Sequence, residues 1–161
     1  MTELSAPRRL APEDNISGFD CGLSLVNDWL ARHLKMAGRQ HTAVAYGTFE
    51  GATLAGYYTL SAYSMAHDDA SGWLRRNSPD PIPVILLGML GVDVRYQTMH
   101  VGGQLLRDAI LRALSAAEII GARALVVEPA TERAAKFYTH YEFRHIAGSE
   151  MVFIPLTSGQ R

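Results

Sequence analysis

The sequence predicts an α/β or α+β protein with one domain, residues 1–161, in which helices flank a central mixed sheet. Three observations favour this class. The 161 residues are 48% hydrophobic, which supplies enough apolar material for one sizeable core. Segments with helical spacing alternate with β-favouring segments along the chain. The single cysteine, Cys21, cannot form an internal disulfide, so packing must hold the fold together.

A first helix is predicted from residue 23, because apolar residues recur there at three- and four-residue spacings and therefore share one face. These residues are Leu23, Val26, Leu30 and Leu34. Asp20 or Ser24 is the candidate cap for the start of this helix, and Gly38 is its predicted end.

A β-hairpin is predicted next. Residues 42–49 and 54–63 are β-favouring, and the turn sequence Glu50-Gly51-Ala52-Thr53 joins them. Residues 65–83 are polar and turn-rich, which predicts a connector with one short helix around Trp73. Residues 84–94 are apolar at both alternating sets of positions, as in a strand that is buried on both faces.

A long helix is predicted after the short loop of residues 95–100. It begins near Gly102 and Gly103, ends before Gly121 and carries a wide apolar stripe. The stripe consists of Leu105, Leu106, Ala109, Ile110, Ala113, Leu114 and Ala117.

The last part of the chain reads as strand, helix and strand. Residues 124–127 are predicted to form a second buried strand, residues 131–141 a helix, and residues 151–156 the final strand. Residues 157–161 are expected to form a loose tail.

Several classes of protein are excluded or disfavoured. The formal net charge of −1 gives no general basic surface, so a nucleic-acid partner would need a local basic patch. The chain has no signal-peptide pattern and no apolar run near the roughly 18 residues of a membrane helix, so we expect a soluble cytoplasmic protein. The six histidines have no zinc-site spacing, so we expect no metal. The P-loop, Rossmann and serine-hydrolase motifs are absent from the sequence.

The most informative segment is the strand, loop and glycine-rich helix start that lead from the buried strand into the long helix. A helix N-terminus presents unpaired N–H groups and partial positive charge, and glycines allow a phosphate to approach the backbone. This segment is therefore a candidate cradle for a phosphorylated cofactor. The alternative is a glycine-rich turn that only packs a helix onto a strand.

Tyr138 is the candidate catalytic residue. The aromatic residues around it, Phe137 and Phe143, are the expected type for core packing. A tyrosine hydroxyl is still protonated at neutral pH, so Tyr138 has a proton to donate to a leaving thiolate. Asp93, at a strand end, is expected to serve as a turn or cap residue.

The chain closely resembles a known family in a series of segments that follow the family's order over nearly the whole length. These segments are Phe19-Asp20-Cys21-Gly22, Gly56-Tyr57-Tyr58-Thr59-Leu60, Pro81-Ile82-Pro83-Val84, Leu86-Leu87-Gly88-Met89-Leu90-Gly91-Val92-Asp93, Gln97-Thr98-Met99-His100-Val101-Gly102 and Ala135-Lys136-Phe137-Tyr138. They resemble the acetyltransferase toxins of bacterial toxin–antitoxin pairs, which belong to the GNAT superfamily of acetyl-CoA-dependent N-acetyltransferases.

The resemblance implies a mostly antiparallel sheet that splays open at the cofactor strand, and Tyr138 as the general acid. It implies that the acetyl-CoA pantetheine arm and pyrophosphate are held by Leu90, Gly91, Val92, Gln97, Thr98, Met99, His100, Val101, Gly102 and Gly103. It also implies acetylation of the α-amino group of aminoacyl-tRNA, which inhibits translation, together with a homodimer and a ribbon-helix-helix antitoxin as partner.

The chain departs from the family pattern at two positions. His100 stands where the pyrophosphate pattern has its middle glycine, and Met89 stands where the family has an arginine. If the backbone at residue 100 requires positive φ, a non-glycine residue there costs about 1 kcal/mol. Histidine tolerates that conformation better than β-branched residues do.

The acceptor and the RNA contacts are open at this point. An α-amine is roughly a tenth neutral at pH 7 and a lysine amine far less, so a site without a strong base suits an α-amine. A small-molecule amine or a protein N-terminus is the first alternative acceptor, and a non-catalytic GNAT-fold binding module is the second alternative. The candidate tRNA-binding residues are Arg32, Lys35, Arg39, Arg75 and Arg76, of which the first three are predicted to share one helix edge.

Overall fold

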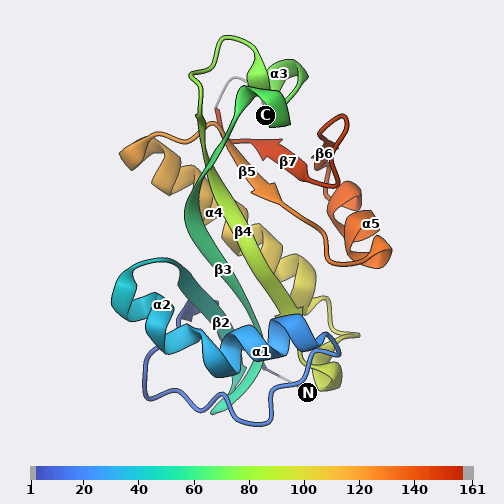
Figure 1. Cartoon of the computed structure of the whole chain (residues 1–161). Helices are drawn as coiled ribbons and strands as arrows, with labels where there is room; N and C mark the ends of the chain where they lie inside the picture. The colour runs from blue at the N-terminus through green and yellow to red at the C-terminus, as the bar shows by residue number, and fades with distance from the viewer. Residues whose placement is uncertain (1–2, 158–161) are drawn as a thin grey trace. The chain divides into compact units, whose positions relative to one another are not determined.

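The computed structural model describes residues 3–157. Within them a seven-stranded sheet has the order β1-β2-β3-β4-β5-β7-β6, and helices flank it (Figure 1). The strands are β1 (Arg8–Arg9), β2 (Val44–Glu50), β3 (Thr53–Met65), β4 (Ile82–Val92), β5 (Ala124–Val127), β6 (Arg144–His145) and β7 (Val152–Pro155). The β4–β5 pair is parallel, whereas the β1–β2, β2–β3, β5–β7 and β6–β7 pairs are antiparallel. The predicted mixed α/β class is confirmed.

The chain divides into two compact units. The first contains the residues up to Ser61 together with Gly88–Ala109, and the second contains Ala62–Leu87 together with the residues from Ile110 onward. Strands β3 and β4 and helix α4 (Val101–Ile120) each contribute residues to both units. The expectation of one domain over residues 1–161 stays a prediction.

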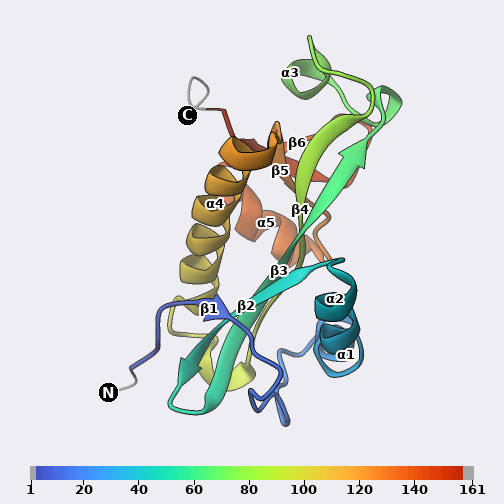
Figure 2. The same ribbon diagram turned by 90° about the vertical axis from the view of Figure 1, so that its left-hand side faces the viewer.

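In the first unit, helices α1 (Ser24–Arg32) and α2 (Leu34–Gln40) lie on one side of the β2–β3 hairpin (Figure 2). The apolar face of α1 closes a core with this hairpin because Val26 and Leu30 pack against Ala45, Phe49 and Tyr57. The Tyr57 hydroxyl also donates a hydrogen bond of 2.6 Å to the Val26 carbonyl oxygen. The chain of α1 is thereby tied to β3 by both apolar and polar contacts.

The prediction of one helix ending at Gly38 is wrong. The helix ends at Arg32, His33 (φ −116°, ψ −15°) serves as the cap between α1 and α2, and α2 continues through Gly38 to Gln40. The break lets both helices turn a small or apolar side chain inward, since Leu30 is 2% exposed and Ala37 is 7% exposed. His41, with φ 56°, ends α2 in the left-handed conformation that commonly follows a helix.

The predicted cap of the first helix is also wrong. Leu23 occupies the N-cap position, without a side-chain cap bond. Asp20 instead uses Oδ1 to accept hydrogen bonds from the Gly22 N–H (2.9 Å) and from the Asn27 side-chain amide (3.0 Å). The carboxylate therefore ties the loop that precedes α1 to an asparagine side chain of the helix, without capping a main-chain N–H of its first turn.

The predicted hairpin is confirmed, with Gly51 and Ala52 as its turn and Glu50 paired with Thr53. The predicted long helix is confirmed as α4, and Gly121 follows it with φ 84°. Glycine populates such a conformation without steric cost, so it stops the helix at the predicted place.

The second unit is built on strands β5 and β7 and on helix α5 (Glu132–His140). All four residues of β5 are buried, as the sequence predicts. The Thr131 hydroxyl caps α5 by accepting the Ala134 N–H at 3.0 Å. The predicted short helix around Trp73 is α3 (Gly72–Arg75), which follows a 3-10 turn at His67–Asp69.

Strands β1 and β6 are short edge elements that the sequence did not predict, because two-residue strands carry no alternating pattern. Thr157 is half-buried, and the remainder of the predicted tail, residues 158–161, lies outside the described residues. No helix between residues 3 and 157 has the length and apolarity that crossing a membrane requires.

Candidate functional site

Strand β4 changes character along its length. Val84, Ile85 and Leu87 are buried, but Gly88 is exposed and Met89 and Leu90 are only half-buried. In the parallel pairing of β4 with β5, Ile85 lies opposite Leu125 and Leu86 lies opposite Val126. These are the two pairs found among the described residues. The prediction of a strand buried on both faces is therefore right for the first half of β4 and wrong for the second half, where Gly88 is exposed and Met89, Leu90 and Val92 are half-buried.

Gly91 is buried, and protein atoms explain why it is a glycine. A Cβ at this position would lie 2.7 Å from the Val26 side chain and 3.1 Å from the Cys21 sulfur. This close approach to the Gly91 backbone is made by α1 and by the loop before it. Met89, one of the two departures noted in the sequence, packs as a partly buried side chain against the apolar core of the first unit.

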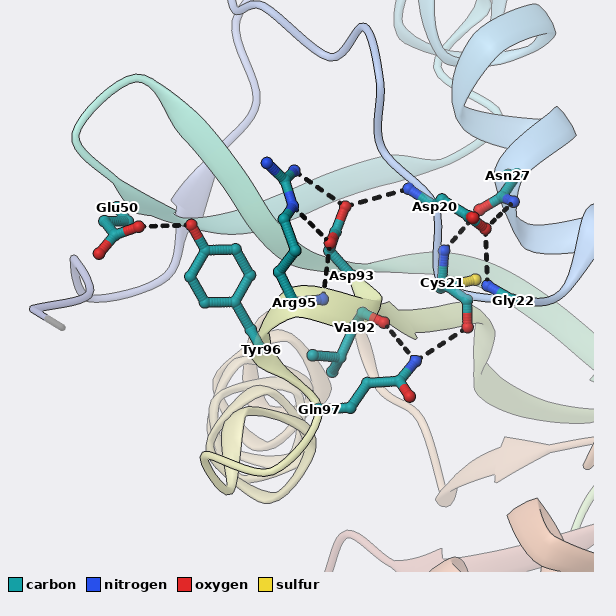
Figure 3. Close-up of polar contacts among 10 residues, drawn as sticks. All are labelled: Asp20, Cys21, Gly22, Asn27, Glu50, Val92, Asp93, Arg95, Tyr96 and Gln97. Carbon is teal, nitrogen blue, oxygen red and sulfur yellow. Dashed lines mark hydrogen bonds and ion pairs between the residues drawn. The ribbon is translucent and has the colours of Figure 1, made fainter.

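Asp93 organises the chain directly after β4 (Figure 3). Its side chain is 1% exposed and accepts hydrogen bonds from the Asp20 N–H (3.1 Å), the Arg95 N–H (3.0 Å) and the Arg95 guanidinium (2.9 and 3.1 Å). The guanidinium hydrogen bonds hold the pKa of the Asp93 carboxyl below its usual range, so it remains ionised. The expected cap role of Asp93 is confirmed, since it caps the 3-10 turn Val94–Tyr96.

The loop after this turn is anchored at its first residue. The Gln97 side-chain amide donates from Nε2 to the Cys21 carbonyl oxygen and to the Val92 carbonyl oxygen, both at 2.9 Å (Figure 3). The neighbouring Tyr96 hydroxyl donates to the Glu50 carboxylate at 2.5 Å. Within the first unit, the loop start is thus tied to the end of β4, to the segment before α1 and to the end of β2.

The rest of the loop is accessible and leads into a helix N-terminus. Gln97, Thr98, Met99 and His100 are exposed, Val101 is buried, and Gly102 and Gly103 are half-buried. His100 has φ 59°, so the positive φ considered for this position is confirmed. The Gln104 N–H donates to the His100 carbonyl oxygen, which makes it the first intrahelical bond of α4.

The N–H groups of Val101, Gly102 and Gly103 precede that first bond, so they have no acceptor within the helix. Such N–H groups, with the positive end of the helix dipole, bind phosphate oxygens well. An exposed loop, a left-handed residue and a 20-residue helix behind it fit the pyrophosphate of a coenzyme. The individual contacts of residues 90–92 and 97–103 with a cofactor stay predictions.

Tyr138 belongs to the second unit, on α5. Its side chain is 5% exposed and its ring packs against Phe137 and Phe143, at centroid distances of 5.2 and 5.5 Å. Burial raises the pKa of Tyr138 well above its usual value, because a phenolate would lose its hydration. Among residues 3–157 its hydroxyl makes no hydrogen bond, so the proton is not committed to a protein acceptor.

The basic candidates fall into two groups. In the first unit Arg32 ends α1, whereas Lys35 and Arg39 lie one turn apart on α2, and all three are exposed. The prediction that they share one helix edge is wrong for Arg32, because the helix breaks at His33. In the second unit Arg75 and Arg76 are exposed at the end of α3.

A residue that sequence reasoning missed, Arg123, holds α3 in place. Its guanidinium donates to the carbonyl oxygens of Leu74 (3.0 Å), Trp73 (2.6 Å) and Arg76 (3.0 Å), and it lies 4.0 Å from the centroid of the Trp73 ring. The one signal for Arg123 in the sequence is its position just before a buried strand. That position does not identify hydrogen-bond partners 47 to 50 residues away. In the described part of the chain, no group of three or more possible metal ligands occurs.

The chain is similar to proteins whose activity is known. No protein-family model matches it. It is 40% identical over 143 residues to a tRNA-acetylating toxin of Mycobacterium tuberculosis (strain ATCC 25618 / H37Rv), covering 89% of this chain and 86% of that protein.

Two solved structures are also similar. One is AtaT complexed with acetyl-methionyl-tRNAfMet, with a TM-score of 0.84 and 27% identity over 95% of both chains. The other is a tyrosine-to-phenylalanine mutant of the AtaT toxin bound to the C-terminus of the antitoxin AtaR and acetyl-CoA. Its TM-score is 0.80, with 26% identity over 95% of this chain and 93% of that chain.

Proposed function

This chain belongs to the family of tRNA-acetylating toxins, and on that basis we propose that it moves the acetyl group of acetyl-CoA to the α-amino group of an aminoacyl-tRNA. The acetylated α-nitrogen is an amide that can no longer act as the nucleophile in peptide-bond formation, so translation is inhibited. The observation that carries this conclusion is the 40% identity to a tRNA-acetylating toxin, which extends over 89% of the chain. The similarity to AtaT in complex with an acetylated aminoacyl-tRNA supports the same acceptor.

Acetyl-CoA supplies the acetyl group as an activated thioester. The amine nitrogen forms a bond to the acetyl carbon, the carbon–sulfur bond breaks, and the nitrogen releases a proton to water. Tyr138 donates its hydroxyl proton to the departing sulfur and regains a proton from solvent. The raised pKa of Tyr138 keeps this hydroxyl protonated before the reaction, and the same apolar surroundings raise the basicity of a thiolate formed beside it.

The chain's other residues bind and orient. The N–H groups of Val101, Gly102 and Gly103 hold the pyrophosphate, with Gln97, Thr98, Met99 and His100 forming the loop around it. The backbone of Leu90, Gly91 and Val92 pairs with the pantetheine arm. An α-amine needs no strong base to become neutral at pH 7, which suits a site whose contribution is positioning and polarisation.

The tRNA is bound by local positive charge, because the whole chain has a net charge of −1. Arg32, Lys35 and Arg39 of the first unit, with Arg75 and Arg76 of the second, are the proposed phosphate contacts. The further elements of the proposal are a homodimer that works in the cytoplasm and an antitoxin of the ribbon-helix-helix type. The AtaT toxin bound to the C-terminus of its antitoxin supports an antitoxin partner in general.

Transfer of radiolabelled acetyl groups by the purified chain tests this function. We expect aminoacylated tRNA to become labelled. Uncharged tRNA, and tRNA whose amino acid is already acetylated, should remain unlabelled. Equal or faster labelling of small amines or of peptide N-termini would overturn the tRNA acceptor. Binding of acetyl-CoA without transfer to any amine would instead identify a binding module.

The cofactor site has its own test. Gly102→Leu places a bulky side chain at the proposed pyrophosphate site and should weaken acetyl-CoA binding at least tenfold, about 1.4 kcal/mol, by calorimetry. Gly38→Leu is the matched control, because Gly38 lies on α2 and a Cβ there meets no atom within 4 Å. Unchanged affinity in Gly102→Leu would move the site elsewhere.

A further inference from the structure

Thr59 places a buried hydroxyl at the point where β4 becomes accessible. It lies on β3, is 3% exposed, and its Oγ1 accepts a hydrogen bond of 2.9 Å from the Met89 N–H on β4. The same two strands are joined by the Asp93 N–H, which donates to the Ala55 carbonyl oxygen at 2.8 Å. Since residue numbers rise on β3 as they fall on β4 between these bonds, the strands run antiparallel here. A side-chain oxygen thus takes part in their ladder at Met89.

Gly88 is matched to this hydroxyl. A Cβ at Gly88 would lie 2.8 Å from the Thr59 Oγ1, closer than real Cβ contacts allow, so a side chain there would displace the hydroxyl or the strand. Gly88 is also exposed, although it stands within a strand of the central sheet, and Met89 and Leu90 are half-buried. The bond from Thr59 therefore fixes a peptide group beside the stretch of backbone that a ligand can reach.

We propose that Thr59 is a positioning residue for acetyl transfer. By holding the Met89 N–H, its hydroxyl sets the plane of the Gly88–Met89 peptide and, through the Met89 backbone, the direction of the Leu90 N–H. A main-chain N–H held in a fixed direction toward the thioester carbonyl oxygen stabilises the negative charge that develops there when the amine adds. This inference rests on the proposed function, because it assumes that the thioester lies along residues 88–90.

Two substitutions separate the hydroxyl from the shape of the side chain. Thr59→Val keeps the volume and removes the acceptor, whereas Thr59→Ser keeps the acceptor. We expect kcat on aminoacyl-tRNA to fall about tenfold or more in Thr59→Val, with the KM values for both substrates within about threefold of the parent, and to recover in Thr59→Ser. Thr59→Val with the parental kcat, or equal losses in both variants, would overturn the proposal.

A matched control measures the effect of losing a buried hydroxyl as such. Thr48 is also 3% exposed in the first unit, and its hydroxyl donates to the Ser5 carbonyl oxygen at 2.6 Å. Thr48→Val should lower the thermal unfolding temperature and leave kcat unchanged. If Thr59→Val does not fold, Thr59→Ala carries the test, because the smaller side chain lets water reach the Met89 N–H. The expected loss of kcat and the overturning result are the same.

The carbonyl group gives a readout that does not depend on the acceptor. With acetyl-CoA labelled with carbon-13 at the carbonyl, the infrared stretching frequency of the bound thioester reports how strongly its oxygen is hydrogen-bonded. We expect a shift to lower frequency in the parent and in Thr59→Ser, and a smaller shift in Thr59→Val. Equal shifts in all three proteins would contradict the role of Thr59. A parent that shows the shift but acetylates no aminoacyl-tRNA would contradict the proposed function alone.

Discussion

Gln97 and Cys21, 76 residues apart in the sequence, are joined by a 2.9 Å hydrogen bond from the Gln97 side-chain amide to the Cys21 carbonyl oxygen. The same amide nitrogen also donates to the Val92 carbonyl oxygen. Both bonds lie at the start of the loop assigned to the pyrophosphate. The side chain of Gln97 therefore shapes this loop through protein contacts, which leaves the binding of phosphate oxygens to the main-chain N–H groups further along.

Tyr138→Phe should lower kcat by about 10² to 10⁴, the usual range for losing a general acid. The ring keeps its packing against Phe137 and Phe143, and among residues 3–157 the hydroxyl has no hydrogen bond to lose, so thermal unfolding and acetyl-CoA affinity should change little. Tyr141→Phe, just beyond the same helix, is the matched control and should keep the parental rate. If the Tyr138→Phe variant keeps the parental kcat, Tyr138 is not the general acid.

His100→Gly should increase the free energy of unfolding by about 0.5–1 kcal/mol, because φ 59° strains any residue with a Cβ. Acetyl-CoA affinity should stay the same or rise, as less bulk borders the pyrophosphate. His41→Gly, at φ 56°, is the control: it should stabilise the fold similarly without any change in affinity. Urea unfolding and calorimetry measure both quantities, and weaker acetyl-CoA binding in His100→Gly would mean that the imidazole contacts the cofactor.

Replacing Lys35 and Arg39 together with glutamine should raise the KM for aminoacyl-tRNA and spare acetyl-CoA binding. The dependence of log KM on log salt should also become shallower, by about 0.7–0.9 for each phosphate that is no longer bound. Arg32→Gln and the Arg75/Arg76 pair are measured separately, because they lie on different elements. The control is the replacement of Arg133 and Lys136, two exposed cations on α5, with glutamine. If the KM for aminoacyl-tRNA is unchanged by substitution of any of the five proposed residues, the tRNA binds another surface.

Asp93→Asn should lower the free energy of unfolding by about 1–3 kcal/mol at neutral pH, since a neutral amide with one acceptor oxygen replaces a buried carboxylate that accepts hydrogen bonds from Asp20 and Arg95. The pKa of Asp93 is lowered in the folded protein, so its stabilisation is present above the usual carboxyl pKa and is lost as the pH falls through the folded value. The difference between parent and variant should therefore shrink below about pH 4. Asp69→Asn, at an exposed site, is the control and should match the stability of the parent at neutral pH in denaturant titrations.

Arg123→Lys should raise the KM for aminoacyl-tRNA several-fold if Arg75 and Arg76 bind the phosphates. A lysine ammonium keeps the charge but cannot reproduce the planar fork that reaches three carbonyl oxygens. Acetyl-CoA affinity, measured in parallel, should be unaffected. Arg133→Lys provides the control for the arginine-to-lysine change. An unchanged KM together with a lowered unfolding temperature would limit Arg123 to a structural role.

Local patterns predicted the regular parts of the fold correctly. The hairpin of β2 and β3 and the length of α4 follow from alternation, helical spacing and the positions of Gly51 and Gly121, all of which are short-range properties. The break at His33 could not be predicted this way. The apolar spacing continues across it, and the break depends on how two helices share one surface of the hairpin.

The same distinction between short-range and long-range properties holds for the candidate site. The pattern in which His100 replaces a glycine raised positive φ at this residue as a condition, and the backbone has φ 59° there. The partners of Gln97, Asp93, Thr59 and Arg123 were not anticipated, because each reaches an atom supplied by a distant part of the chain. Sequence spacing carries no information about which main-chain carbonyl or N–H will lie opposite a polar side chain after folding.

The left-handed conformation of His100 also bears on how proteins of this kind are detected. A search pattern that demands glycine at this place excludes histidine, asparagine and aspartate, which also adopt the positive φ found here at modest cost. Such a pattern would pass over chains like this one. A pattern that admits those three residues, and that also asks for the loop-anchoring glutamine three positions earlier, would follow the backbone requirement itself.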